Sequence, residues 1–367
     1  MELITVRPGQ DLTGICRKYG VDRQELIWLD QLCEAVGICP GQCLLLPGDS
    51  RPAGELELAG GLRLGSQLPL ELPKLSWLII RGLGLRCDGS LLSLPRLPSF
   101  PRGTLPILSV SPLGREGFCP RLAHRLLEDD EAQERFADEL AETVLKLGFR
   151  GAELDFQHLY GFDRDSYTAF VQRLSQRLHQ EGAYLLLALA PQGREGDCCS
   201  LCAGQDLKAL APWADRFILL LRELNGPEAA PQPPAPLGEI RRCLEYALEH
   251  IPAGKIMLSL GMDACTWPLP WRKGDRGRMT EPRQAAALAA SQGAEIRYDR
   301  SSGAAFFTYS LPEGRRIAWM EDLRSLARRM ELAKELGLGG MELPRLEGLW
   351  RPAWKYIEDS CYIRQLP

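Results

Sequence analysis

The fold is decided by one short stretch, Gly151-Ala152-Glu153-Leu154-Asp155-Phe156-Gln157. Its first part has the length and apolar character of a buried strand. An amphipathic helical pattern follows over residues 164–180, and a second apolar run covers residues 184–189. A strand, a helix and another strand in this order predict a parallel βαβ unit.

The same alternation extends in both directions from this unit. Further candidate strands lie at residues 77–80, 105–110, 217–221, 255–260 and 339–343, and further candidate helices at 131–147, 237–250 and 323–336. Repeated strands and helices at this count predict an α/β fold of the (β/α)8 barrel type. A doubly wound open sheet is the alternative, but no GxGxxG follows the first strand. Residues 306–309 and 317–322 do not fit the alternation and predict a small α+β insertion at about 266–320.

The bulk properties are those of an ordinary globular protein. The chain has 367 residues, of which 45% are hydrophobic and 25% charged, and its net charge of -4 gives no reason to expect nucleic acid as a partner. No apolar run is long enough to span a bilayer, and the first residues lack a basic segment followed by an apolar one. We therefore expect no membrane span and no signal peptide.

The first 48 residues form a separate pattern. Residues 4–6 alternate like a strand, residues 12–19 and 23–32 have helical spacing, and residues 43–47 close the pattern as a second strand. This βααβ module resembles a LysM domain over its whole length. The matching residues are the run 4–12, Ile15, Tyr19, Leu26, Leu29, Leu32, and the runs 38–42 and 44–47. We expect the module at 1–48, a Pro/Gly/Leu-rich linker at 49–73 and the barrel at 74–367.

The LysM resemblance implies a shallow groove that binds N-acetylglucosamine-containing glycans. Two loops would form it, and its residues would be Pro8, Gly9, Gln10, Asp11, Leu12, Gly37, Ile38, Pro40 and Gly41. Asp30 stands where LysM domains usually carry Asn, which leaves the details of the sugar contact open. One module normally binds weakly, so a second linked glycan site would raise avidity.

The larger part of the chain resembles the spore cortex-lytic N-acetylglucosaminidase branch of glycoside hydrolase family 18. The resemblance is carried by residues 151–157, 165–167, 187–191, 296–299, 319–322 and 337–340. It implies a (β/α)8 barrel with the insertion described above. It also implies peptidoglycan as the partner, a place on the spore surface or cell wall after synthesis in the cytoplasm, and spore-coat proteins as further candidate partners.

The catalytic motif departs from the family pattern. The family's DxxDxDxE falls on Arg150, Glu153, Asp155 and Gln157, so only Asp155 is unchanged. In the family the last acid protonates the glycosidic oxygen, while the preceding Asp orients the acetamido group that attacks the anomeric carbon. A Gln amide donates a hydrogen bond but cannot release a proton, and losing a general acid costs on the order of 10²- to 10⁴-fold in rate. The sequence therefore predicts a catalytically impaired barrel that binds glycan.

Two alternatives remain for the barrel site. Residues two apart on a strand share a face, so Glu153, Asp155 and Gln157 should line the barrel interior, and Glu153 or Glu223 is the candidate replacement acid of a diverged but active enzyme. The family's Met-x-Tyr-Asp on the sixth strand and its Trp on the last strand are missing from residues 221–224 and 341–345. Arg150 and Arg222 are expected to pair with Glu153 and Glu223 as a structural network rather than to bind an anionic sugar.

The cysteines and tryptophans give weaker signals. Of twelve cysteines only Cys198, Cys199 and Cys202 cluster, and a loop with reduced thiols is favoured over a metal clip. A structural coat protein cross-linked through cysteines is the third functional alternative. We expect no cofactor and no metal, since no HExxH or comparable spacing occurs. Among the tryptophans, Trp267 and Trp271 are the best candidates for stacking on a sugar because they lie in a Pro-rich loop.

Overall fold

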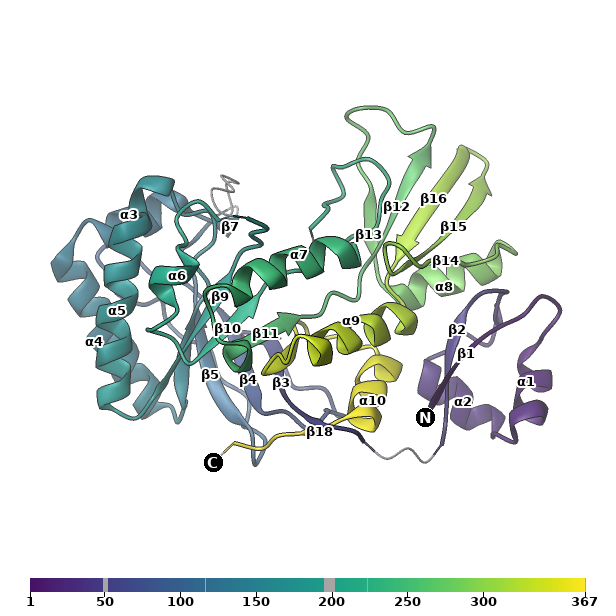
Figure 1. Cartoon of the computed structure of the whole chain (residues 1–367), viewed down its shortest axis with the longest axis horizontal. Helices are drawn as coiled ribbons and strands as arrows, with labels where there is room; N and C mark the ends of the chain where they lie inside the picture. Colours follow the sequence, from purple (N-terminus) through teal and green to yellow (C-terminus); the bar gives the residue numbers. More distant parts are fainter. Residues whose placement is uncertain (49–51, 116, 195–201, 223, 367) are drawn as a thin grey trace.

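The computed structural model describes all residues except 49–51, 116, 195–201, 223 and 367. The chain forms an N-terminal module, a barrel and an insertion that lies between the barrel and the module (Figure 1). None of the helices in the described part of the chain has the length and apolar character needed to cross a membrane.

The N-terminal module has the predicted βααβ order. Its elements are β1 (Glu2–Thr5), α1 (Leu12–Tyr19), α2 (Arg23–Asp30) and β2 (Cys43–Leu46), with β1 and β2 paired antiparallel. Each helix begins at an aspartate that caps it: the carboxylate of Asp11 accepts from the Gly14 N–H, and that of Asp22 from the Glu25 N–H. The apolar residues on the inner faces build a small core of Ile4, Val6, Ile15, Leu26, Leu44 and Leu46.

The barrel is closed by eight parallel strands. In order around the barrel they are β3 (Glu55–Arg63), β4 (Trp77–Leu83), β5 (Leu105–Val110), β8 (Gly151–Leu154), β9 (Tyr184–Leu189), β10 (Arg216–Leu219), β11 (Ile256–Ser259) and β17 (Gly340–Leu343), and β17 pairs with β3. The strands are apolar because both of their faces are buried. The predicted (β/α)8 barrel is confirmed.

Helices surround the strands on the outside (Figure 1). They are α3 (Pro120–Leu127), α4 (Asp130–Lys146), α5 (Arg164–Gln180), α6 (Leu207–Leu210), α7 (Leu237–Leu248), α9 (Leu323–Glu335) and α10 (Arg351–Ser360). Short elements complete the chain: the hairpin β6 (Leu113–Gly114) and β7 (Gly117–Phe118), the 3-10 turns η1 (Gly161–Asp163) and η2 (Ala253–Lys255), and β18 (Tyr362–Ile363), which adds to β3.

The first barrel strand lies inside the segment predicted to be a linker. Strand β3 pairs with β4 and β17, so the barrel begins at Glu55 rather than at residue 74, and residues 49–73 are not one connector. The glycines that suggested a linker are required by packing. A Cβ on Gly61 would lie 2.3 Å from the Pro344 carbonyl oxygen, and one on Gly60 would lie 2.9 Å from a methyl of Leu75.

The predicted insertion is a five-stranded antiparallel sheet with one helix. Its elements are β12 (Ala264–Leu269), β13 (Arg278–Thr280), α8 (Pro282–Ser291), β14 (Arg297–Asp299), β15 (Ala304–Leu311) and β16 (Gly314–Met320). The strand order is β13-β12-β16-β15-β14. Ala285 and Ala289 of α8 form a core with Phe307 and Ala318 of the sheet. The first strand of the insertion begins at Ala264.

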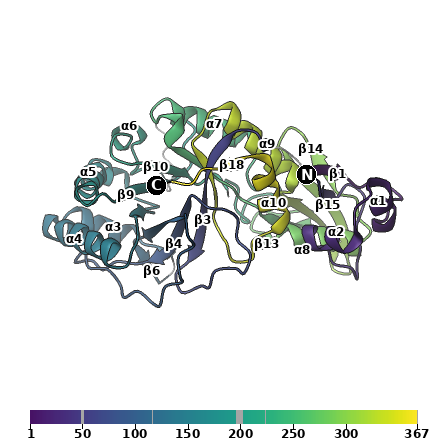
Figure 2. The same ribbon diagram turned by 90° about the horizontal axis from the view of Figure 1, so that it is seen from below.

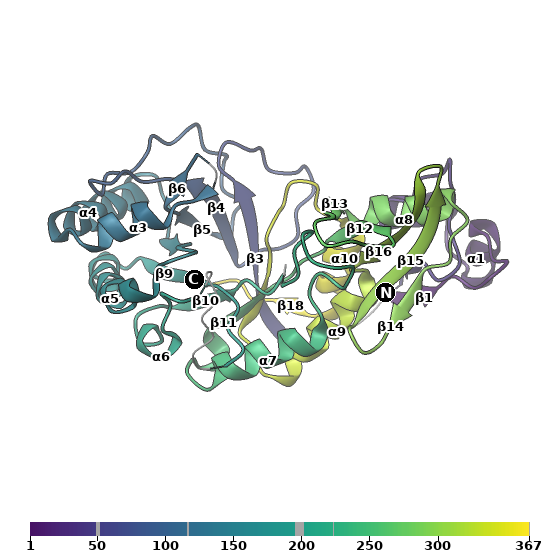
Figure 3. The same ribbon diagram turned by 90° about the horizontal axis from the view of Figure 1, so that it is seen from above.

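The module is fixed to the insertion and to α10 by polar contacts. Figure 2 shows α1 and α2 at one end of the molecule, with α2 beside α8 and α10 and with α4 and α5 at the other end, and Figure 3 shows α1 and α4 at the same opposite ends. The Ile296 N–H donates to the Pro40 carbonyl at 2.9 Å, and the Arg351 N–H donates to Gln31 Oε1 at 2.9 Å. A Cβ on Gly41, whose φ is +80°, would lie 1.7 Å from the Ile296 carbonyl oxygen. Only glycine fits this contact.

Candidate functional site

Asp155 and Gln157, the last two of the four predicted motif residues, meet just beyond the end of β8. Gln157 Nε2 donates a hydrogen bond to Asp155 Oδ1 at 2.8 Å. The Gln157 side chain is buried, and Asp155 is partly buried beside it. Both lie at the carboxyl end of a barrel strand, which is where barrel enzymes carry their sites. The amide of Gln157 is therefore held by the neighbouring carboxylate at the carboxyl end of the strand.

Glu153 is held in an ion-pair cluster inside the barrel. The Arg81 guanidinium, on β4, contacts the Glu153 carboxylate through Nη2 at 2.6 Å and Nε at 3.1 Å. The same guanidinium lies 2.5 Å from Glu342 Oε1, on β17. Both glutamates are fully buried. Burial alone would lower the pKa of Arg81, but the carboxylates of Glu153 and Glu342 outweigh it and raise the pKa above its ordinary value.

Burial is also the main influence on Asp155. It raises the pKa of the Asp155 carboxyl to about 6, and the nearby Glu153 carboxylate adds to the rise. The positive charges of Arg81 and Arg222 and the hydrogen bond from Gln157 oppose it. Tyr167, on α5, lies behind the site with its ring stacked on Phe156, and burial followed by the charge of Asp155 raises the pKa of its hydroxyl.

The predicted pairing of Arg150 is not found in the structure. Arg150 is exposed before the start of β8, and Glu153 pairs with Arg81, so the predicted pairing of Arg150 with Glu153 is wrong. The side chains of residues 150 and 153 lie at different depths because Arg150 precedes the strand. Arg222 acts electrostatically on Asp155, as its place after β10 suggests. Glu223 lies outside the described residues.

Sequence reasoning missed Arg81 and Glu342. Arg81 directly follows the apolar run of β4, and Glu342 interrupts the apolar run of β17. A charged residue within a strand that is buried on both faces needs a partner. A charged residue in each apolar run was therefore the available sequence signal, although it does not indicate which charged residues pair across the barrel.

The tryptophans expected to stack on sugar are engaged elsewhere. Trp267 is buried, with 1% of its surface exposed, and donates its indole N–H to the Pro227 carbonyl at 3.2 Å. Trp271 is partly exposed and donates to the Asp275 carbonyl at 3.1 Å. The prediction for Trp267 is therefore wrong, because its ring faces are covered by protein.

The two predicted glycan-binding loops of the module differ in their surroundings. Pro8, Gly9 and Asp11 are exposed, and Gln10 and Leu12 are half-buried. In the second loop Gly37 is exposed, whereas Pro40 and Gly41 contact Ile296 of the insertion. Ile38, between them, is half-buried. The second loop is thus part of the contact between module and insertion.

Asp30 has a structural partner within the module. It is buried, and its Oδ1 accepts from the Leu45 N–H at 3.0 Å. Burial raises the pKa of the Asp30 carboxyl well above its usual range, and the hydrogen bond from Leu45 opposes this rise. Asp30 therefore ties α2 to β2.

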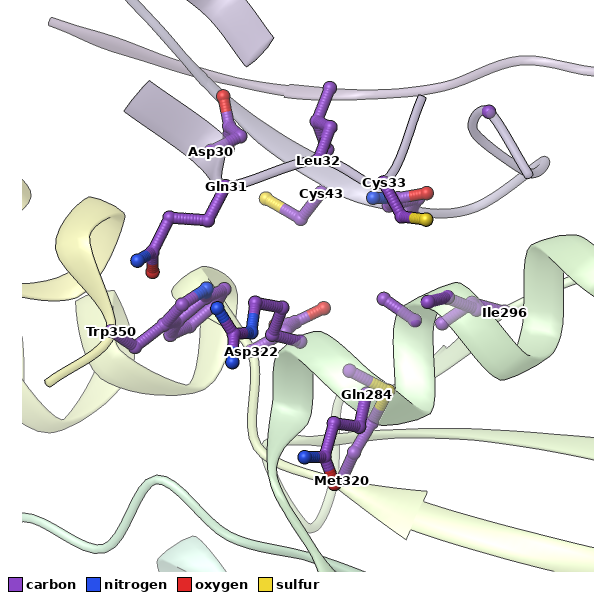
Figure 4. Close-up of a pocket in the computed structure, with 15 residues that line it drawn as sticks. Asp30, Gln31, Leu32, Cys33, Cys43, Gln284, Ile296, Met320, Asp322 and Trp350 are labelled. Carbon is purple, nitrogen blue, oxygen red and sulfur yellow. The ribbon is translucent and has the colours of Figure 1, made fainter. Parts of the chain in front are cut away.

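A cavity lies between the module and the insertion (Figure 4). Its volume is about 320 Å³, and residues from the end of α2, the following loop, α8 and the segment before α10 line it. The indole ring of Trp350 and the carboxamide of Gln31 lie at one side of it, and Gln284 lies on α8 at the other (Figure 4). A second cavity of about 100 Å³ adjoins it and reaches the carboxyl ends of β11 and β17.

Most of the described cysteines are buried. Burial raises the pKa of Cys39, Cys265 and Cys361 to about 11, which suppresses the reactive thiolate. Cys198 and Cys199 of the predicted cluster lie outside the described residues, and Cys202 is buried. Over the part of the chain that the structure covers, no group of His, Cys, Asp and Glu side chains is arranged to hold a metal ion.

Comparison with known proteins places the barrel in a family. The sequence profile of the glycosyl hydrolases family 18 matches residues 123–343. The chain belongs to this family. Among curated relatives, the Cortical fragment-lytic enzyme of Bacillus subtilis is 30% identical over 264 residues, covering 71% of this chain and 61% of that protein. The putative sporulation-specific glycosylase YdhD of Bacillus subtilis is 27% identical over 265 residues, covering 72% of this chain and 61% of that protein.

Solved structures show that the likeness extends beyond the family 18 barrel. The Bacillus cereus spore cortex-lytic enzyme SleL superimposes with a TM-score of 0.87 at 21% identity, covering 99% of each chain. The fold of the whole chain, with module, barrel and insertion, is therefore shared. The family 18 chain spans about 61% of the length of the first two curated relatives.

Proposed function

We propose that this family 18 protein binds N-acetylglucosamine-containing glycan of peptidoglycan and cleaves it inefficiently at most. Its curated relatives include a cortical fragment-lytic enzyme and a sporulation-specific glycosylase, which supports a spore glycan as the ligand. The mother-cell cytoplasm as the place of synthesis and the spore surface as the destination are part of the same proposal.

The hydrogen bond between Gln157 and Asp155 carries the proposal. An acid at position 157 would give a proton to the glycosidic oxygen as the bond to the anomeric carbon breaks, while the substrate's acetamido oxygen attacks that carbon. Gln157 can supply only a hydrogen bond. Its Nε2 is 2.8 Å from Asp155 Oδ1, so one of its two N–H groups is directed at the carboxylate, and neither can be released as a proton.

Glu153 is a poor replacement for the missing acid. Its two carboxylate oxygens both contact the Arg81 guanidinium, so both are engaged in an ion pair. A general acid must also come within about 3 Å of the glycosidic oxygen. A fully buried carboxylate in the barrel interior does not meet this condition without breaking the ion pair.

Residual hydrolysis is the second candidate function, and the environment of Asp155 favours it. A carboxyl whose pKa is about 6 retains a proton on a sizeable fraction of molecules near neutral pH. Asp155 would then be the donor, and activity would fall as the pH rises through 6. Glu223 is the other candidate donor.

The N-terminal module supports glycan binding through its βααβ fold. We propose that it is a LysM domain whose exposed loop, residues 8–12, takes part in sugar contact. The second loop is less available, because Pro40 and Gly41 contact the insertion.

A cross-linked coat protein is a weaker alternative. Of the cysteines that the structure describes, only Cys33 and Cys87 are exposed. A buried thiol cannot reach a neighbouring molecule without local opening, so few disulfides between folded molecules are available. Binding to spore-coat proteins is a separate proposal and does not require cysteines.

The decisive experiment is mass spectrometry of soluble fragments released from spore cortex peptidoglycan. The unmodified protein is compared with Gln157→Glu and with the control Gln157→Met, which has a similar side-chain length but no proton to give. We expect no fragments from the unmodified protein or the control, and fragments from Gln157→Glu.

Fragments from the unmodified protein would contradict the impaired-enzyme proposal. If all three proteins release no fragments but sediment together with the insoluble glycan, binding is the function. A failure to bind glycan would remove the proposal altogether.

A further inference from the structure

We propose a second glycan-binding site in the trench between the N-terminal module and the barrel. The trench consists of the two adjoining cavities described above; Trp350, Gln31, Gln284 and Ala287 form its walls near the module, and Asp263 and Arg345 lie at its barrel end. This inference rests on the proposed function, because it takes the same class of ligand. It is distinct from the loop at residues 8–12 and from the degenerate motif on β8.

The trench is continuous from the module to the barrel mouth. Gln31, Arg283 and Trp350 line both cavities, so the two spaces share a wall. At one end lies Gly37 of the module, and at the other lies Asp263, which follows β11. A polymer that occupies the trench would therefore run from the module toward the end of the barrel where sites are found. The cavity of about 320 Å³ falls within the usual size of small-molecule sites, roughly 300–1,000 Å³.

The walls offer an aromatic ring and amide groups, as expected for a sugar site. Trp350 is half-buried, and its Nε1 is a buried donor without a hydrogen-bond partner among the described residues. In Figure 4 this indole lies at the cavity, opposite the ribbon of the module. Gln31, Gln42 and Gln284 add carboxamide groups to the lining. An apolar ring face together with a few polar groups suits a pyranose, which has an apolar face and hydroxyl and acetamido groups at its edge.

Most of the charges in the trench are paired, and the two remaining carboxylates of the lining, Asp30 and Glu347, accept hydrogen bonds from the backbone N–H groups of Leu45 and Arg63. Arg345 Nη2 is 2.7 Å from Asp263 Oδ1, and Arg283 Nη2 is 3.4 Å from Glu281 Oε2. Asp322, at the cavity near the module, is paired with Arg324 at 2.6 Å. A lining of paired charges has little net potential and favours a neutral ligand over a polyanion. This selects a neutral N-acetylglucosamine chain rather than a nucleic acid or an acidic peptide.

The trench is held open by the docking of the module. Arg351, next to Trp350, donates its N–H to Gln31 Oε1 and places its guanidinium 4.2 Å from the centre of the Trp28 ring. The ion pair between the Met1 amino group and Asp359, at 2.6 Å, adds a second anchor on the same helix. A preformed site avoids the entropy cost of ordering its walls when ligand binds.

The test is the affinity of the full chain for chitohexaose by isothermal titration calorimetry. Ala287→Arg places a long side chain from α8 in the cavity, and Ser291→Arg adds the same charge at an exposed position on the same helix as a control. Trp350→Ala removes the aromatic wall. We expect Ala287→Arg and Trp350→Ala each to weaken binding by roughly three- to tenfold, with Ser291→Arg unchanged. Circular dichroism and thermal melting establish that each variant is folded.

The outcomes separate this inference from the proposed function. If the unmodified chain binds chitohexaose and folded Ala287→Arg binds equally well, the trench is not a glycan site, while glycan binding stands. If the unmodified chain does not bind chitohexaose, both proposals are overturned. Binding of a free peptidoglycan stem peptide that Ala287→Arg abolishes, without binding of chitohexaose, would make the trench a peptide site and overturn its assignment to glycan.

Discussion

Replacing Arg81 with methionine should destabilise the barrel by about 3–5 kcal/mol. The substitution keeps much of the side-chain volume but removes the positive charge that Glu153 and Glu342 share. Both carboxylates are fully buried, so neither can turn to water without a local rearrangement.

The magnitude follows from the cost of leaving charges unpaired. At an effective dielectric constant of about 20, two unit charges roughly 4 Å apart attract by about 4 kcal/mol. Arg81 makes two such pairs, but the desolvation of all three groups offsets most of this attraction in the native protein. Removing the Arg81 cation leaves the two carboxylates desolvated and removes their attraction to a positive charge. Neutralising Arg81, Glu153 and Glu342 together removes both the desolvation cost and the attraction.

The measurement is the free energy of unfolding in urea for Arg81→Met and for the triple variant Arg81→Met/Glu153→Gln/Glu342→Gln. We expect the triple variant to recover much of the loss. Arg241→Met is the matched control, since Arg241 makes a two-point pair with Glu335 on the surface and its loss should cost less than about 1 kcal/mol. If Arg81→Met costs no more than Arg241→Met, or if the triple variant is less stable than the single one, the reasoning about the buried cluster is refuted.

Two further predictions concern Asp155 and the docking of the module. Burial raises the pKa of Asp155 to about 6, so the ionised carboxylate destabilises the folded protein above that pH and has no effect below about pH 4. Asp155→Asn should therefore raise the free energy of unfolding by roughly 2–3 kcal/mol at about pH 7.5, with little gain at about pH 4. Equal effects in urea titrations at the two pH values would contradict this. Gly41→Ala should speed hydrogen exchange in the module and α8, because the new methyl group would clash with the Ile296 carbonyl. Gly37→Ala is the control: its φ is similarly positive and its backbone strain costs a similar amount, about 1–2 kcal/mol, but its methyl group meets no atom within 4 Å. Equal exchange in the two variants would show that this contact does not hold the module.

Most of the barrel was predictable because its strands are buried on both faces. Such strands appear in the sequence as apolar runs, and residues 105–110 are buried throughout. Strand β3 was missed because its sequence contains Glu57, Gly60 and Gly61. Glu57 is fully buried and paired with Arg216 and the Trp77 indole, so a polar residue stands where an apolar one is expected.

The candidate site was predictable only as far as it lies on one segment. The spacing of Asp155 and Gln157 predicted that their side chains would share one face of the strand. The partner of Glu153 comes from another strand, and only the register between strands decides that it is Arg81 rather than Arg150. The docking of the module was beyond prediction for a similar reason, since no local pattern indicates that Gly41 meets Ile296.

The closure of the barrel by pairing of its first strand, β3, with its last, β17, has a consequence for synthesis on the ribosome. Strand β3 leaves the ribosome early, but both strands that pair with it at this edge are made last. In β17, Gly340 pairs with Glu57, and in β18, Tyr362 pairs with Glu55. The nascent chain must therefore hold an open sheet while the insertion between β11 and β17 is still being made. An open parallel sheet has free edges that can join those of other chains. Chaperone supply and translation speed should accordingly decide how much of this protein reaches the closed barrel.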